Sequence, residues 1–179
     1  MDEQFTDRLR VAVPSCLRGF RVTEAALPEP WDDNPRSVWR IACACGSAEG
    51  RFLGYSLRDY AVYDGPETFL SPIAFECKTC QTVTELLDTD LHGYHAEIAR
   101  RIGEEGSTKL RGQGPRTPYP CPNCRNEFHC VLAAFVFWNA GELVEEYDSG
   151  WEDLFNVFLC YCTCANCGCR FQPTEFGKL

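Results

Sequence analysis

Four closely spaced pairs of cysteines constrain the fold of this chain more than any other feature of its sequence. The chain has 179 residues and 13 cysteines, and eight of these cysteines form the pairs. A turn of the C-x-x-C type places two sulfurs on one edge of a tetrahedron, and a second such turn supplies the opposite edge. Two of these turns together predict a site for one tetrahedral metal ion, most often zinc. The pairs are Cys43 with Cys45, Cys77 with Cys80, Cys121 with Cys124, and Cys164 with Cys167.

We predict two metal sites, each formed by two consecutive pairs. The first site consists of Cys43, Cys45, Cys77 and Cys80, and the second of Cys121, Cys124, Cys164 and Cys167. Gly46 directly follows the first pair and suits a tight turn, because glycine tolerates a positive φ. The other cysteines are interpreted as small buried hydrophobic residues. Three of them lie close to the last pair and stay open as alternative ligands, namely Cys160, Cys162 and Cys169.

The amino-terminal residues and the thiols predict a cytoplasmic location. Residues 1–15 include several charged side chains, which is not the composition of a secretory signal peptide. No run of about 18 apolar residues is present, so we expect no membrane span. Thiols persist in a reducing compartment, where paired cysteines bind metal rather than form disulfides.

The charge of the chain narrows the class of partner. The formal net charge is −9 at pH 7, and eight thiolates with two divalent ions would make the loaded protein more negative. Such a charge disfavours nonspecific binding to nucleic acid and favours a basic protein partner. The acidic residues of 142–153 form either the surface for that partner or a solvated hairpin tip, and an exposed Trp151 would anchor an interface. These residues are Glu142, Glu145, Glu146, Asp148, Glu152 and Asp153.

Hydrophobic patterns predict a mainly β protein with a short helix. Apolar residues recur every fourth position in residues 93–103, which predicts the short helix, and a weaker pattern of the same kind covers residues 2–13. Apolar, β-branched and aromatic residues predict the strands. The predicted strands cover residues 20–23, 37–42, 51–63, 68–76, 82–88, 127–139, 154–163 and 170–176.

The predicted elements repeat in one order, which indicates two antiparallel β units in tandem. In each unit a cysteine turn is followed by a strand, a Tyr-Asp turn, a second strand, a second cysteine turn and a third strand. Glycines and prolines interrupt the pattern between the units. We therefore divide the chain into an N-terminal helix and loop (1–36), a first unit with the short helix (37–102), a Gly/Pro linker (103–118) and a second unit (119–179).

The Cys-Pro-Asn-Cys and Cys-Ala-Asn-Cys turns at 121–124 and 164–167 resemble those of zinc-ribbon proteins. The resemblance covers residues 39–88 and 119–176 and points to no specific family of zinc ribbons. It implies two structural zinc ions and an exposed face that recognises protein or nucleic acid. Rubredoxin-like iron is the alternative metal, since its ligands are also two C-x-x-C turns.

Two further clusters suggest other functions. His92 and His95 lie near Asp88, Asp90 and Glu97, a combination that would suit a metal-dependent enzyme. Basic residues of 100–116, with Tyr94 and Tyr119, would suit nucleic acid. We predict instead a non-enzymatic module that binds structural zinc and a protein partner. The basic residues are Arg100, Arg101, Lys109, Arg111 and Arg116.

Overall fold

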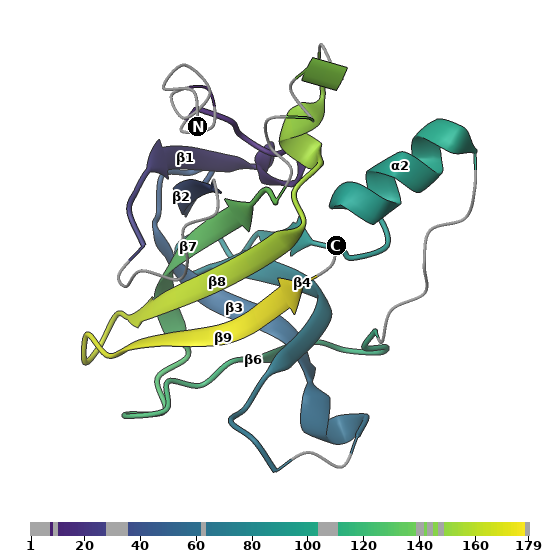
Figure 1. The fold of residues 1–179 in the computed structure, drawn as a ribbon. Coiled ribbons are helices and arrows are strands. Elements are labelled where there is room, and N and C mark those ends of the chain that lie inside the picture. The colour runs from purple at the N-terminus through teal and green to yellow at the C-terminus, as the bar shows by residue number, and fades with distance from the viewer. Residues whose placement is uncertain are drawn as a thin grey trace.

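The computed structural model describes residues 8, 11–27, 36–61, 64–103, 111–138, 142, 145–146 and 149–177. This part of the chain is mainly β with one short α-helix, which confirms the predicted fold class (Figure 1). The helices are the 3₁₀ turns η1 (Ser15–Leu17), η2 (Leu57–Asp59) and η3 (Trp151–Asp153), and α2 (Tyr94–Ile102). The strands are β1 (Phe20–Glu24), β2 (Arg36–Cys43), β3 (Glu49–Ser56), β4 (Phe69–Cys77), β5 (Val83–Leu87), β6 (Thr117–Pro118), β7 (Phe128–Val136), β8 (Val157–Cys164) and β9 (Arg170–Gly177).

The described strands form one antiparallel sheet in which elements from the two halves of the chain interleave. Its main path runs β1-β2-β7-β3-β4-β5, while β8 pairs with β7 and β9 pairs with β8. Strand β7 therefore lies beside β2 and β3 on one side and beside β8 on the other. Strands from both predicted units belong to this one sheet. The division of the chain into two units at residues 103–118 remains a prediction from the sequence.

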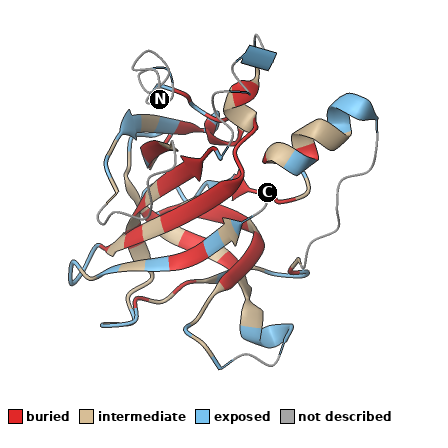
Figure 2. Ribbon diagram, in the orientation of Figure 1, coloured by how far each residue is buried: buried red, intermediate tan, exposed pale blue. Residues whose placement is uncertain are grey.

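The sheet curls so that its two ends approach each other around the main core. The hydroxyl of Thr174 in β9 donates a hydrogen bond of 2.8 Å to the carbonyl of Phe69 in β4. Buried residues follow the inner sides of β2, β4, β7 and β8 (Figure 2). Stacked and edge-on aromatic rings fill the space between β3, β4 and β9. These rings include Phe52, Phe69, Tyr119 and Phe171.

Residues 111–118, from the second half of the predicted linker, are held on the body of the protein. The phenol of Tyr60 bonds to both the N–H and the carbonyl of Gln113, at 2.7 and 2.8 Å. The guanidinium of Arg116 donates to the carbonyl of Pro72 and pairs with Glu85. Strand β6 adds backbone pairing with β3. These contacts fix the entry of the chain into the third cysteine pair.

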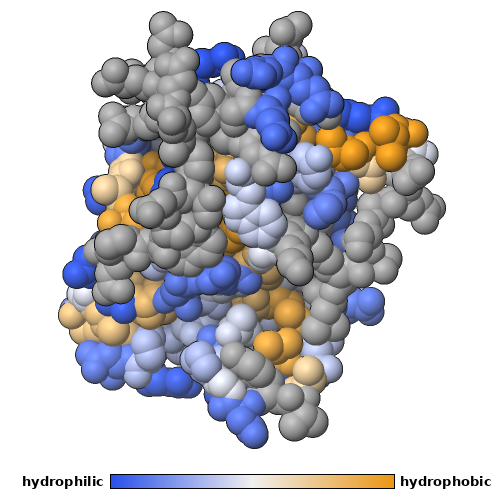
Figure 3. All heavy atoms as spheres, in the orientation of Figure 1, coloured by the Kyte–Doolittle hydropathy of each residue, from blue (hydrophilic) through white to orange (hydrophobic). Residues whose placement is uncertain are grey.

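Helix α2 matches the helix predicted at residues 93–103 and lies at one side of the sheet (Figure 1). The N–H of Tyr94 donates to the carbonyl of Phe155, and Ala96 is buried. Ile102 at the far end is exposed, in the region where Figure 3 shows hydrophobic atoms at the surface. No helix in the described ranges is long and apolar enough to cross a membrane. Most of the helix predicted at residues 2–13 falls outside these ranges.

Candidate metal centres

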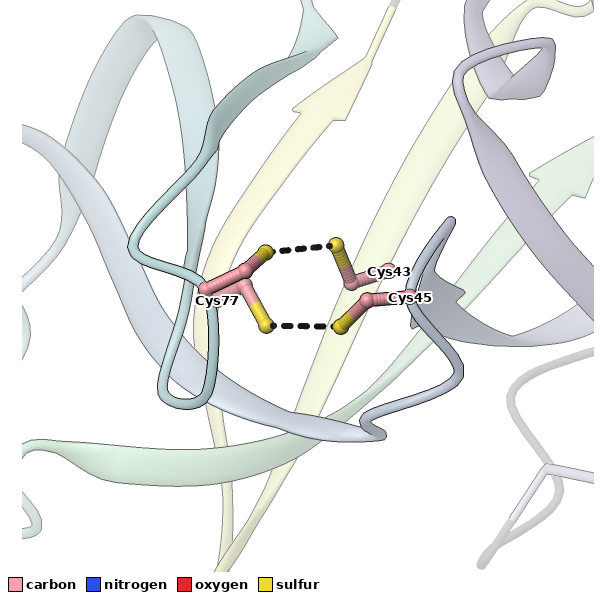
Figure 4. A group of neighbouring side chains, drawn as sticks. Cys43, Cys45 and Cys77 are labelled. Carbon is pink, nitrogen blue, oxygen red and sulfur yellow. Dashed lines mark hydrogen bonds between the residues drawn. The ribbon is translucent and has the colours of Figure 1, made fainter.

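The first predicted set of cysteines comes together where β2 and β4 end. Cys43 is the last residue of β2 and Cys45 lies in the turn that follows. Cys77 is the last residue of β4 and Cys80 lies in the turn that follows. Figure 4 shows sulfurs from the two turns facing one another across a small gap. The Sγ atoms of Cys43 and Cys80 are 3.5 Å apart, and those of Cys45 and Cys77 are 3.6 Å apart. All four sulfurs lie within 4.8 Å of one another.

The second predicted set has the same arrangement. Cys121 and Cys124 lie in the turn before β7. Cys164 is the last residue of β8 and Cys167 lies in the turn that follows. The sulfurs of Cys121 and Cys167 are 3.7 Å apart, and those of Cys124 and Cys164 are 3.5 Å apart. The structure therefore gathers all eight predicted cysteines into the two predicted groups.

Each of the four turns ends in a residue with a positive φ. These residues directly follow the second cysteine of each pair, and this conformation turns the chain back sharply after the pair. Glycine adopts this backbone conformation without strain. Two of the four residues are not glycine, and few non-glycine residues adopt a positive φ. The residues are Gly46 (97°), Gln81 (59°), Arg125 (64°) and Gly168 (70°).

The backbone hydrogen bonds of the two groups also correspond. In the later turn of each group, the N–H of Gln81 donates to Cys77 and that of Gly168 donates to Cys164, at 2.9 and 3.0 Å. In the same turn of each group, the residue after the first cysteine donates its N–H to the carbonyl of the first residue of a strand, at 3.0 Å in both groups. The donors are Lys78 and Ala165, and the acceptors are the carbonyls of Glu49 in β3 and Phe128 in β7.

Hydrogen-bond donors lower the pKa of two cysteines in each group, which favours the thiolate form that metal binding requires; these are Cys77, Cys80, Cys164 and Cys167. Burial and the neighbouring thiols outweigh the donors at Cys43, Cys121 and Cys124 and raise their pKa. Burial opposes ionisation of Cys164, but the N–H groups of Cys167 and Asn166 and the amide of Asn126 outweigh it and lower its pKa to about 5. The hydroxyl and N–H of Thr82 lower the pKa of Cys80 to about 6. Thiolate, not thiol, is the form that ligates zinc or iron.

The remaining cysteines lie outside both groups. Cys160 and Cys162 are buried in the main core, and burial raises the pKa of Cys160 well above its usual value. Cys16 is also buried, and its pKa is raised by burial and by the nearby carboxylate of Asp153. Cys169 is half-buried and points its thiol at the carbonyl of Arg170, 3.8 Å away. Burial thus supports the interpretation of Cys160 and Cys162 as small core residues.

The histidine cluster has a structural explanation in its contacts. The Nδ1 atom of His92 accepts a hydrogen bond from the N–H of Asp88 at 2.9 Å, and partial burial lowers the pKa of His92. Asp88 and Asp90 both pair with the guanidinium of Arg111. His95 is exposed beside the ring of Tyr94. Within the described ranges, neither histidine belongs to a group placed to hold a metal ion.

Most of the basic residues proposed for nucleic acid are engaged by carboxylates. Arg100 and Arg101 pair with Glu97, and Arg116 pairs with Glu85. Tyr119 is buried, and its hydroxyl donates to the carbonyl of Glu67 at 2.8 Å. Lys109 lies outside the described residues.

The acidic segment is exposed in part. Glu142, Glu145 and Glu146 are exposed, Glu152 and Asp153 are half-buried, and Asp148 lies outside the described residues. Trp151 is buried at 4% exposure, so it does not form an interface anchor. Trp138 on the other flank is 44% exposed. Its backbone N–H is fixed by a hydrogen bond to the side chain of Asn156.

Sequence reasoning missed the residues that connect the two groups. Gly50 lies opposite Cys77 on one side and opposite His129 on the other, and His129 in turn lies opposite Cys164. His129 is fully buried, and its Nε2 donates to the carbonyl of Tyr119 at 2.8 Å. Gly50 looked like an ordinary glycine in a strand, a position that can signal close approach of another backbone.

The chain matches no protein-family model, no curated protein and no solved structure in the three comparisons made. The function is therefore inferred from the site itself.

Proposed function

We propose that the protein is a structural zinc-binding module that presents an acidic surface to a basic protein partner. The observation that carries this proposal is the convergence of eight cysteine sulfurs into two groups of four. We further propose that the module acts without catalysis of its own and in the cytoplasm, because a reducing compartment keeps its thiols available for metal.

The spacing of the sulfurs suits a tetrahedral ion. Four sulfurs at about 2.3 Å from zinc are about 3.8 Å apart along each edge of the tetrahedron. The four cross-turn distances of 3.5–3.7 Å are close to this value. Four thiolates with no open position form a closed site, which is typical of structural rather than catalytic zinc. Iron in a rubredoxin-like site is the alternative, and a red colour in the oxidised protein would identify it.

Replacement of one ligand tests the metal assignment. We expect Cys124→Ser to remove about one zinc equivalent per chain, because a site of three thiolates binds far more weakly. Elemental analysis of freshly purified, reduced protein measures this. Cys169→Ser is the matched control, because Cys169 follows Cys167 closely in the sequence but lies outside the group. The Cys169→Ser protein should retain two zinc equivalents. Two equivalents in Cys124→Ser would contradict the assignment of the second site.

The acidic partner surface rests on its exposed residues. Glu142, Glu145 and Glu146 are exposed, and Trp138, which comes shortly before them in the sequence, is half-exposed. Aromatic rings with a charged rim are common in protein interfaces. The acidic charge would also speed encounter with a basic partner.

Charge reversal tests this surface. We expect lysine at positions 142, 145 and 146 to abolish capture of a basic partner from cell extract while leaving the metal content at two equivalents. Rim charges mainly alter association rate and salt dependence, so capture should also weaken as salt is raised in the unaltered protein. The matched control reverses Glu67 and Glu85, which already pair with arginines elsewhere. Equal capture by the reversed and unaltered proteins would contradict the proposal.

We propose that the two groups belong to an internal repeat. The corresponding hydrogen bonds of Lys78 and Ala165 support it, as do the four positive-φ turns. The pairing of β3 with β7 also has twofold character, because Glu49 faces Cys130 and Arg51 faces Phe128 on either side of the Gly50–His129 pair. In this interpretation β3, β4 and β5 correspond to β7, β8 and β9.

Binding of single-stranded nucleic acid is a second candidate, favoured by a face of the sheet that the sequence did not indicate. Thr23, Arg40, Leu132 and Tyr161 lie opposite one another across β1, β2, β7 and β8. Side chains at such positions share one face. Alternation places Arg21 and Arg170 on the same face, away from the main core. The side chains of Arg21, Arg40 and Arg170 make no hydrogen bond or ion pair within the described ranges.

Replacement of the three arginines tests this candidate. We expect the triple change to glutamine to weaken binding of a labelled single-stranded oligonucleotide and to reduce its salt slope by about 2, since each lost contact contributes about 0.7. Fluorescence anisotropy at several salt concentrations measures both. The control replaces Arg58, Arg100 and Arg116, which are paired with carboxylates. Absence of binding by the unaltered protein at low salt would exclude the candidate.

A further inference from the structure

We propose that the two cysteine groups bind metal cooperatively, so that an ion in one group raises the affinity of the other. This inference rests on the proposed function in one respect, that both groups bind metal. It goes further by assigning the coupling to a single row of residues across the centre of the sheet. The row consists of Cys77 in β4, Gly50 in β3, His129 in β7 and Cys164 in β8.

The row connects one ligand of each group through adjacent strands. Strands in a sheet are about 4.8 Å apart, so its two ends are separated by about 14 Å. Cys77, His129 and Cys164 are all buried. A hypothetical Cβ on Gly50 would lie 2.4 Å from the carbonyl oxygen of Glu76 and 2.4 Å from the ring of Phe75. The strands therefore approach too closely at Gly50 for one to shift without the other.

His129 extends the row to a second ligand pair. Its ring donates to the carbonyl of Tyr119, two residues before Cys121. The ring also lies edge-on to Phe171, at 5.1 Å between centroids, and Phe171 follows the last turn. One buried side chain thus contacts the segments that lead into and out of the second group.

A second set of contacts joins the groups on the opposite side of the sheet. Lys78 lies inside the turn of the first group, and its Nζ is 2.7 Å from a carboxylate oxygen of Glu49 and 5.3 Å from the ring centre of Phe128. Arg51 lies over the same ring at 5.0 Å. The carbonyl of Phe128 accepts the N–H of Ala165, inside a turn of the second group. A turn of each group therefore contacts Phe128.

Cooperativity follows from this shared structure. An ion in a group holds its two turns together, so binding restricts the motion of both turns. Ordering the first group fixes the start of β3 and the end of β4. Through the row it also fixes the start of β7 and the end of β8. The second ion then binds to turns that are already ordered, and less conformational entropy is lost. By linkage, the effect must be equal in both directions.

Partial loading of the unaltered protein provides the first test. The full chain is stripped of metal under reducing conditions, zinc is added to one equivalent, and native mass spectrometry counts the ions on each molecule. Independent sites of equal affinity give about half of the molecules with one ion, and unequal independent sites give more. We expect clearly less than half, with empty and doubly loaded chains predominating. A singly loaded fraction of about half or more would overturn the inference.

Single-site variants measure the coupling. We expect Cys80→Ser to weaken cobalt(II) binding at the second group about 10-fold, and Cys167→Ser to weaken the first group by a similar factor. Unchanged affinity of the intact group would overturn the inference and leave the proposed function standing. Failure of the unaltered chain to bind any metal would remove both. If a variant does not fold, the partial-loading experiment decides alone.

A variant outside the ligand set tests the route. Phe128→Leu keeps all eight cysteines and removes the ring that Lys78 and Arg51 contact. We expect it to increase the singly loaded fraction. Trp138→Leu is the control, because Trp138 is a half-exposed aromatic residue beyond the far end of β7. An equal increase in the control would overturn the assignment to this route.

Discussion

Removal of metal from the reduced protein is expected to abolish its cooperative thermal unfolding transition. Structural zinc contributes about 10–16 kcal/mol of apparent binding free energy per ion in small sites. A folded domain of ordinary stability has only about 5–15 kcal/mol of unfolding free energy in total. Loss of two ions therefore exceeds what the remaining core can supply. Circular dichroism during heating, with and without a chelator, measures the transition, and elemental analysis confirms that the metal is gone.

Re-addition of zinc is the control for this experiment. The transition should return when zinc is restored, because the thiols stay reduced and the sheet can form again around the ions. The same chelator added to a variant that has serine at all eight cysteines should change nothing. A stripped protein with unchanged melting temperature and no measurable metal would show that the core alone holds the fold. That result would leave the eight cysteines without a structural role.

The sequence predicts local elements well because their signals are local. The strand predicted at residues 127–139 corresponds to β7, where six of the nine residues are buried. The grouping of cysteines was predicted for a similar reason, since the two sulfurs of each turn lie within a few residues of each other. The short helix also follows from a pattern within a dozen residues.

The joining of the two halves was not predicted, because its signals lie far apart in sequence. β2 pairs with β7 through residues more than 90 positions apart, such as Trp39 and Ala133. No hydrophobic pattern states which strand will lie beside which, since a two-residue period specifies faces and not neighbours. The sheet face that carries three arginine side chains without carboxylate partners was not predicted, for the same reason. Arg21, Arg40 and Arg170 come together only when β1, β2, β7, β8 and β9 are placed side by side.

Gly50 shows where a long-range contact leaves almost no local signal. It lies between Cys77 of β4 and His129 of β7, and its lack of a side chain permits the close approach of Glu76 and Phe75. The glycine serves packing rather than a turn, because it lies within strand β3 and no positive φ is involved. A sequence pattern does not distinguish this position from a glycine that merely weakens a strand.

Gly50→Ala is therefore expected to be one of the most damaging single changes outside the cysteines. The added Cβ would meet a backbone oxygen and a buried aromatic ring at 2.4 Å, and the backbone contact cannot be relieved by turning a side chain. We expect a loss of at least about 2 kcal/mol of unfolding free energy, or a fall of about 4–8 °C in the melting temperature. Because Gly50 lies in the row between Cys77 and Cys164, affinity for metal should fall at both groups. Thermal denaturation and metal titration measure the two effects.

Gly177→Ala is the matched control for this prediction. Gly177 is also a strand glycine, at the end of β9, but a Cβ there would meet no atom within 4 Å. Alanine should be tolerated, with a change within about 0.5 kcal/mol, as is usual for exposed positions. If Gly50→Ala and Gly177→Ala melt at the same temperature, the close approach of β3 and β4 is not a constraint on the fold. If only the first group loses affinity in Gly50→Ala, the glycine supports its neighbouring ligand alone, and the central row does not transmit the disturbance to the second group.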